Sequence, residues 1–151
     1  MKLKRIFAVL IAAATVAVLS CCNAKVEQGV DDQTDSGIEM FLKIDDTVVA
    51  VEWENNRSVD ALFSLAEGGL TVKMEKYGGF EQVGDIGATL PSDDRQMTTE
   101  CGDIVLYASS QLVIFYGSNS WRYTKLGKIN VSQSKIISML SGGDVTVTIG
   151  V

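Results

Sequence analysis

The sequence of 151 residues contains no histidine, and this absence removes several classes of chemistry. Histidine is the commonest metal ligand, the commonest general base near neutral pH and the usual partner of a serine or cysteine nucleophile. Ser-His-Asp, Cys-His and His-metal sites are therefore excluded for this chain. A calcium site made only of carboxylates stays possible in principle, but Asp31, Asp32 and Asp35 lack the glycine and glutamate spacing of an EF-hand loop. We expect no metal and no other cofactor.

Basic residues are outnumbered: 13 Lys and Arg face 19 Asp and Glu, which gives a net charge of −6. Three of these cations, Lys2, Lys4 and Arg5, precede an apolar leader. If the leader is removed, the mature chain is more acidic still. A nucleic-acid partner is not expected, because such proteins present basic surfaces. The roughly 130 residues after the leader suffice for one domain, which we expect to be monomeric.

The first 20 residues have the pattern of a signal peptide. Residues 6–19 are almost wholly apolar, a run too short to cross a hydrocarbon core of ~30 Å as a helix. Val18-Leu19-Ser20-Cys21 ends the run with a small residue directly before a cysteine. This segment resembles the lipobox of bacterial lipoproteins, in which that cysteine carries a thioether-linked diacylglycerol. The resemblance implies lipidation of Cys21 and a membrane-anchored protein of the cell envelope; a plain secretory signal, giving a secreted or periplasmic protein, is the alternative.

Cysteine is scarce, with two thiols left if Cys21 is lipidated: Cys22 and Cys101. A disulfide between them is one possibility. We favour a buried, inert Cys101.

Residues 21–37 are predicted to be an acidic flexible tether, because they are polar and show no apolar periodicity. The folded domain is predicted to span residues 38–151. Proline occurs once in the chain, at Pro91, inside a glycine-rich stretch over residues 77–94 that is expected to be a long functional loop.

Short alternating segments predict a mainly β domain. A hairpin is expected around Asp45-Asp46, and a short helix capped by Asn56 or Ser58 is expected to run to Glu67. A second helix over residues 132–140 should turn Ile136, Ile137 and Leu140 inward. Further strands are expected at residues 70–74, 103–108, 111–116, 121–123, 125–129 and 144–149. The pattern predicts a closed or nearly closed antiparallel barrel of about eight strands with two short helices.

Three segments carry a family resemblance: MEKYGGFEQVGDIGATLP, then GDIVLY, then QLVIFYGSNSWRYTKLGKI. In this order they resemble the bacterial cyclophilin-like domain family, over residues 39–149. The resemblance implies an eight-stranded barrel capped by two helices, with a shallow groove on one outer face and a mostly unassigned function. It also extends distantly to true cyclophilins, whose groove motifs correspond to the segments around Phe80, Gln111 and Trp121.

Departures from the cyclophilin pattern fall on its groove residues. Cyclophilins place an arginine five residues before the groove phenylalanine, where it donates to the prolyl nitrogen and weakens amide resonance. Counting back from Phe80 gives Glu75, which cannot donate when ionised. The groove histidine corresponds to Tyr123, and the methionine beside Phe80 to Glu81. Prolyl isomerase activity is therefore not the favoured prediction.

The predicted function is a lipid-anchored, noncatalytic barrel that binds a peptide, a protein or a small ligand in a surface groove. A weak peptidyl-prolyl isomerase and a structural envelope component without a ligand remain alternatives. Phe115 is expected in the core, because it sits in an apolar strand. The candidate groove residues are aromatic or polar: Tyr77, Phe80, Gln82, Gln111, Trp121, Arg122 and Tyr123.

Overall fold

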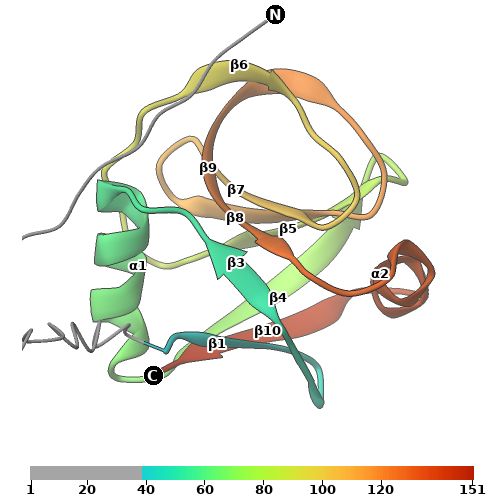
Figure 1. Cartoon of the computed structure of the whole chain (residues 1–151), viewed down its shortest axis with the longest axis horizontal. Helices are drawn as coiled ribbons and strands as arrows, with labels where there is room; N and C mark the ends of the chain where they lie inside the picture. Colours follow the sequence, from blue (N-terminus) through green and yellow to red (C-terminus); the bar gives the residue numbers. More distant parts are fainter. Residues whose placement is uncertain (1–38) are drawn as a thin grey trace, which may run out of the picture. The chain divides into compact units, whose positions relative to one another are not determined.

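The computed structural model describes residues 39–151, a β-barrel flanked by two helices (Figure 1). The predicted signal peptide, the lipidation site at Cys21, Cys22 and the tether lie outside the described residues. The ten strands, in chain order, are β1 (Phe41–Ile44), β2 (Thr47–Val49), β3 (Val51–Trp53), β4 (Leu70–Tyr77), β5 (Glu81–Asp85), β6 (Arg95–Thr98), β7 (Asp103–Tyr107), β8 (Gln111–Phe115), β9 (Ser120–Ile129) and β10 (Val145–Gly150).

Nine strands form one hydrogen-bonded path in the order β2-β1-β10-β4-β5-β8-β7-β9-β3, and β6 pairs only with β9. All these pairs are antiparallel. The two ends of the path meet at Ala50, which joins β2 to β3 and accepts a hydrogen bond from the Asn130 amide at 2.8 Å. Counting β2 and β3 as one interrupted strand gives the predicted eight. The predicted nearly closed antiparallel barrel is confirmed.

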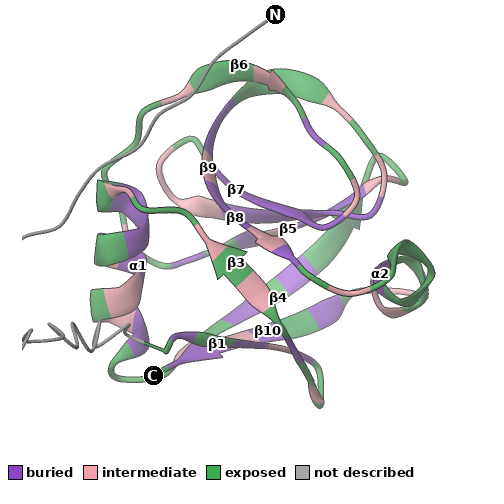
Figure 2. Cartoon of the chain, in the orientation of Figure 1, coloured by how far each residue is buried: buried purple, intermediate pink, exposed green. Residues whose placement is uncertain are grey.

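Helix α1 (Arg57–Ala66) begins at Asn56, whose side chain accepts hydrogen bonds from the amides of Ser58 and Val59. This settles the cap, since the Ser58 hydroxyl donates instead to the Pro91 carbonyl at 2.6 Å. An asparagine in this position satisfies amides that the first turn leaves without partners. The buried side of α1 faces the barrel and its opposite side is exposed (Figure 2). The buried residues are Ser58, Val59, Leu62 and Ala66.

Helix α2 (Gln133–Leu140) lies at the other side of the barrel from α1 (Figure 1). Ile136 and Leu140 are buried, as expected, but the prediction for Ile137 is wrong: its side chain is 38% exposed. A step of about 100° per residue carries Ile137 off the face that Ile136 and Leu140 share. An eight-residue helix at the barrel's edge buries only a narrow stripe.

The segment expected to be a long loop, residues 77–94, contains β5, which hydrogen-bonds to β4 and β8. Its alternation is hidden in the sequence because Glu81 and Gln82 are polar and Gly84 has no side chain. β6 was not predicted either, since its residues are polar and mostly exposed. Residues 121–123 and 125–129, predicted as separate strands, are one strand, β9, whose register against β7 shifts at Leu126. Such a bulge bends a strand, and β9 extends past the barrel to pair with β6.

Two apolar clusters hold the domain together. The larger fills the barrel with inward side chains such as Leu42, Val147 and Leu112. The smaller consists of Val105, Val113, Phe115 and Tyr123, with Phe80, Val83 and Met97 packed against it. Its members point the other way from the barrel-filling residues of β5, β7 and β8, so it lies on the outer surface of those strands. This outer cluster is the floor of the site described next.

Candidate functional site

Strand alternation builds a polar and aromatic surface over the outside of β4, β5, β8 and β7. On β5, Gln82 and Gly84 face inward, whereas Glu81, Val83 and Asp85 face outward. On β8, Leu112 and Ile114 fill the barrel while Gln111 and Val113 face outward. Successive side chains of a strand point to opposite faces, so each strand contributes every second residue.

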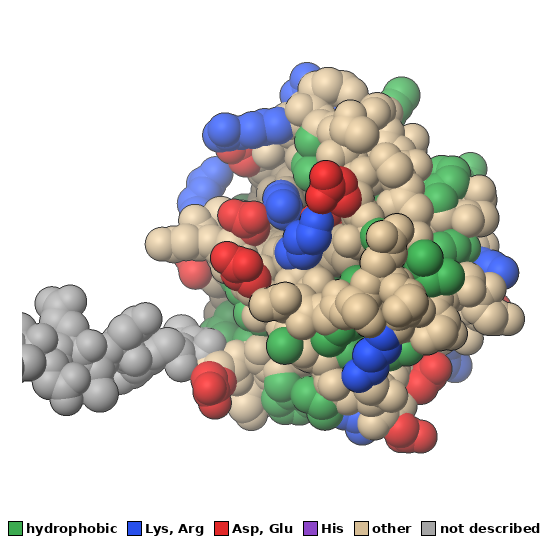
Figure 3. Space-filling model, turned by 45° about the vertical axis from the view of Figure 1, so that its right-hand side comes forward, with side chains coloured by type: hydrophobic (Ala, Val, Ile, Leu, Met, Phe, Trp, Pro, Cys, Tyr) green, Lys and Arg blue, Asp and Glu red, His purple; other side chains and the backbone are tan. Residues whose placement is uncertain are grey.

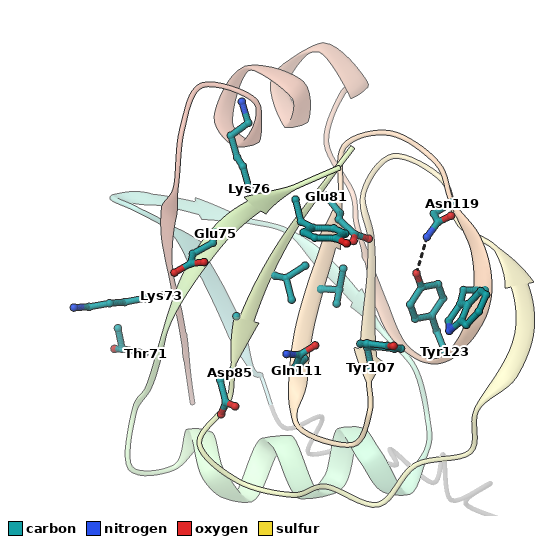
Figure 4. Close-up of a pocket in the computed structure, with 15 residues that line it drawn as sticks. Thr71, Lys73, Glu75, Lys76, Glu81, Asp85, Tyr107, Gln111, Asn119 and Tyr123 are labelled. Atoms are coloured by element: carbon teal, nitrogen blue, oxygen red, sulfur yellow. Dashed lines mark hydrogen bonds between the residues drawn. The ribbon is translucent and has the colours of Figure 1, made fainter. Parts of the chain in front are cut away.

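An open cavity of about 920 Å³ lies over this surface (Figure 4). Figure 4 draws Thr71, Lys73 and Glu75 of β4 at one end and Asn119 and Tyr123 at the other, with Glu81 between them. The volume is within the range of small-molecule sites. The lining residues are Thr71, Lys73, Glu75, Lys76, Tyr77, Glu81, Val83, Gly84, Asp85, Tyr107, Gln111, Val113, Asn119, Trp121 and Tyr123.

Aromatic rings pack at the Tyr123 end of the cavity. Tyr123 lies edge-on to Phe115, with ring centroids 5.6 Å apart, and edge-on to Tyr107 at 5.9 Å. Phe80 stacks parallel to Phe115 at 6.5 Å. These are favourable geometries for rings, which carry a negative face and a positive edge. They fix the position of Tyr123 while Trp121 stays 57% exposed.

The Tyr123 hydroxyl accepts a hydrogen bond from the side-chain amide of Asn119 at 3.0 Å. Burial raises the pKa of Tyr123, the bond from Asn119 opposes this rise, and the nearby Glu81 and Tyr107 add to it. Since the oxygen accepts from Asn119, its own proton is left to donate. Tyr123 is therefore a neutral hydrogen-bond donor at physiological pH.

Glu81 is the most unusual group in the cavity. Only 6% of the residue is exposed, and its Oε2 atom is buried without a hydrogen-bond partner in the described part of the chain. Burial raises the pKa of this carboxyl to about 7. A carboxyl in a dry site resists ionisation because the charge loses its hydration. Glu81 therefore exchanges a proton near neutral pH, as groups at functional sites often do.

Four of the predicted groove residues come together around the cavity: Tyr77, Gln111, Trp121 and Tyr123. Tyr77 is 67% exposed, whereas Tyr123 is 5% exposed. Phe115, which was expected in the core, is fully buried. Phe80 is half-buried beneath the cavity in the outer cluster rather than on its lining.

Gln82 and Arg122 do not line the cavity. Gln82 is completely buried, and its Nε2 donates to the carbonyls of Leu140 and Gly143, both at 2.7 Å. Its place is structural: it ties β5 to the loop that follows α2. Arg122 alternates away from Tyr123 on β9 and donates to the Asp94 carbonyl at 2.8 Å. The sequence placed both in groove motifs but could not show on which side of the sheet they point.

Glu81, Tyr107 and Asn119 were not among the predicted groove residues. Glu81 corresponds to a cyclophilin methionine, and a buried carboxyl cannot be told from a solvated one by sequence. Tyr107 is two strand positions from Val105 and so shares its outward face. This alternation could have predicted that Tyr107 lines the cavity. Asn119 lies in the loop before β9, and no sequence pattern indicated its place in the cavity.

No arginine of the described residues lines the cavity. Glu75 on β4, which corresponds to the cyclophilin arginine, is one of the lining residues. Residues 39–151 also contain no group of three or more Cys, Asp or Glu placed to hold a metal ion. The buried Asp103 meets Lys128 at 3.4 Å and Lys125 at 3.7 Å, outside the cavity. That cluster is an ion-pair network.

Cys101 is half-buried rather than buried as expected, and burial raises the pKa of its thiol. The raised pKa keeps the thiol protonated and unreactive. Its suggested partner, Cys22, lies outside the described residues.

Basic and acidic side chains are grouped together on the face drawn in Figure 3, with no broad basic patch there. Within residues 39–151, no helix combines the length and apolar character needed to span a bilayer.

Comparison with known proteins gives one result. No curated protein and no solved structure matches the chain. One family model does match, that of the Cyclophilin-like family, over residues 42–150, which takes in the barrel from β1 to β10. The chain therefore belongs to the Cyclophilin-like family.

Proposed function

We propose that this chain is a membrane-anchored binding module, whose cyclophilin-like barrel holds a peptide or a small ligand in the cavity over β4, β5, β8, β7 and β9. The observation that carries the proposal is the composition of that cavity. Exposed Tyr77 and Trp121 offer stacking surface, while Glu81, Tyr123 and Gln111 offer hydrogen bonds. Aromatic rings and polar groups that converge on one cavity are both features of ligand sites.

The cavity gives little support to prolyl isomerisation. That reaction needs a donor at the prolyl nitrogen to weaken the resonance behind a barrier of ~20 kcal/mol. The position that corresponds to the cyclophilin arginine holds Glu75, and no arginine of the described residues lines the cavity. A carboxylate there repels the substrate carbonyl. We therefore propose that the domain is noncatalytic.

The anchor part of the proposal is supported by the sequence alone. Three early cations, a short apolar run and Leu19-Ser20-Cys21 form the pattern of a lipoprotein leader. Several acyl chains, at ~0.8 kcal/mol per buried methylene, hold a protein stably on a bilayer. The acidic segment of residues 21–37 then serves as a spacer between lipid and barrel.

The binding role is tested on the full chain purified from membranes in mild detergent, with native mass spectrometry and peptide sequencing of whatever co-purifies. Trp121→Ala should lose the bound species, because it removes a ring from the cavity lining. Phe41→Ala is the matched control, since Phe41 is a 41% exposed aromatic on β1, outside the cavity. If both variants keep every bound species, the cavity is not the binding site.

The prediction that the domain is noncatalytic is tested with the same preparations in a protease-coupled assay on a proline peptide. We expect no acceleration above the uncatalysed rate. Acceleration that Trp121→Ala abolishes and Phe41→Ala preserves would restore the isomerase alternative.

A further inference from the structure

The buried Oε2 of Glu81 lacks a hydrogen-bond partner among the described residues, and no ion pair within them involves Glu81. Leaving a buried polar group unsatisfied is costly, so natural proteins seldom do so without a reason. Glu81 is more than nine-tenths buried and still lines the cavity, between the β4 side chains and Tyr123 (Figure 4). Its missing partner can therefore arrive through the cavity.

The cations that line the cavity do not supply that partner. The Nζ of Lys76 donates to the Ser141 carbonyl at 2.7 Å, on the side of α2. Lys73 is exposed on β4 and points away from Glu81 in Figure 4.

The surroundings of Glu81 favour a positive group over a neutral or negative one. Trp121, which is 57% exposed, offers a ring whose face attracts cations. The lining holds three carboxyl groups, those of Glu75, Glu81 and Asp85, and two ammonium groups, those of Lys73 and Lys76, of which Lys76 is already engaged with the Ser141 carbonyl. A neutral hydroxyl satisfies one oxygen of Glu81 but gains little from the ring or from the other carboxylates.

We infer that the cavity recognises a ligand through a primary ammonium group, with Glu81 as its counter-ion and the Trp121 ring beside it. This rests on the proposed binding function and names the chemistry of the ligand. A free amine and the lysine side chain of a peptide both present this group. Binding is coupled to proton loss: the Glu81 carboxylic acid and the ammonium ion become an ion pair, and the carboxyl proton leaves to the buffer.

Other titratable groups line the cavity or lie near Glu81 on each neighbouring element. The carboxylates of Glu75 and Asp85 lie in exposed positions. The groups are Lys73, Glu75, Lys76 and Tyr77 from β4, Asp85 from β5, Tyr107 from β7, Tyr123 from β9, and Tyr116 directly after β8.

Isothermal titration calorimetry on the full chain in an uncharged detergent tests the inference with two matched pairs of probes. The first pair is 2-phenylethylamine and 2-phenylethanol. The second is a terminally blocked Gly-Lys-Gly peptide and its norleucine counterpart. Each titration is run in buffers of different ionisation enthalpy, which measures the protons released.

We expect at least one amine probe to bind at least about tenfold more tightly than its uncharged partner, as a charge-assisted hydrogen bond allows. About one proton per bound amine should be released at pH 6 and few at pH 8.5, where Glu81 is already ionised. Glu81→Gln should abolish both the preference and the proton release. Glu67→Gln, an exposed glutamate at the end of α1, should change neither. Which amine binds distinguishes a free amine from a peptide lysine.

Equal affinity for charged and uncharged probes, unchanged amine binding in Glu81→Gln, or no binding of any probe would overturn the inference. The proposed function fails separately, when Trp121→Ala keeps every species that co-purifies with the native chain. Uncharged probes that bind the native chain but not Trp121→Ala would leave the binding module standing and remove the ammonium preference.

Discussion

The side-chain amide of Asn119 donates to the hydroxyl of Tyr123 at 3.0 Å, and this bond sets the direction of the tyrosine proton. Asn119 is itself held in place. Its Oδ1 accepts from the Ser120 amide, and its backbone exchanges hydrogen bonds with the fully buried Thr99. The loop before β9 thereby orients a donor that β9 carries into the cavity.

Asn119→Leu should raise the pKa of Tyr123 further, because it removes the one influence that lowers this pKa while burial and Glu81 continue to raise it. The measurement is an alkaline titration followed by NMR of tyrosines labelled at Cζ. Tyr123→Phe identifies the resonance. An unchanged or lowered pKa would show that the bond does not form in solution.

Glu81 should make the native domain less stable as pH rises. Its folded-state pKa of about 7 lies above the ordinary value of 4.5, so the native state binds more protons than the unfolded state between these values. The contribution of Glu81 to the free energy of unfolding is fully present below about pH 4.5 and is lost as pH rises through 7. The free energy of unfolding should fall by about 1–3 kcal/mol across this window. Urea unfolding at several pH values measures it.

Glu81→Gln should flatten that part of the profile, because glutamine does not titrate. Glu67→Gln should leave the slope as it is in the native chain. If the native and Glu81→Gln profiles are parallel from pH 4.5 to 7, the carboxyl titrates normally and the burial argument is wrong.

Gln82→Met should destabilise the domain by about 2–3 kcal/mol, since it leaves the Leu140 and Gly143 carbonyls without their donor. Gln82→Glu should cost more, because a carboxylate would face two carbonyl oxygens in a buried site. Gln96→Glu, an exposed counterpart on β6, should stay within about 0.5 kcal/mol. Denaturant unfolding gives all three values. Equal costs for Gln82→Glu and Gln96→Glu would contradict the buried position.

Gly84→Ala should destabilise the domain by about 1–3 kcal/mol through overpacking between β4 and β5. A Cβ at Gly84 would lie 2.5 Å from the Lys73 carbonyl oxygen, a backbone atom that cannot swing aside. Gly142→Ala is the matched control, because its Cβ would meet nothing within 4 Å. Thermal unfolding of both variants tests this; similar melting temperatures for the two would argue against close contact at Gly84.

Cys21→Ser should move the protein from the membrane fraction to the soluble fraction or leave an uncleaved precursor, because the proposed lipidation requires the thiol of Cys21. Cys22→Ser should remain in the membrane fraction. Fractionation and mass determination of the N-terminus distinguish these results. A Cys21→Ser protein that is processed and still sediments with membranes would contradict the lipoprotein leader.

Local patterns predicted most of the fold. The hairpin at Asp45-Asp46, the cap of α1, and the inward face of β10 are each encoded within a few neighbouring residues, and the structure confirms them. β5 escaped prediction because its identity depends on partners on both sides, β4 and β8, that are distant in the chain.

The sequence by itself determined the absence of histidine chemistry, the acidic charge, the lipobox pattern and a small antiparallel barrel. These follow from composition and from periods of two or four residues. Only the tertiary structure decided which motif residues face the cavity: Gln82 turns inward and Arg122 away, whereas Glu81 enters the lining and is desolvated. The physical reason is that burial and hydrogen-bond supply are properties of the assembled strands, so one glutamate's protonation is fixed only when β4, β5, β7, β8 and β9 come together.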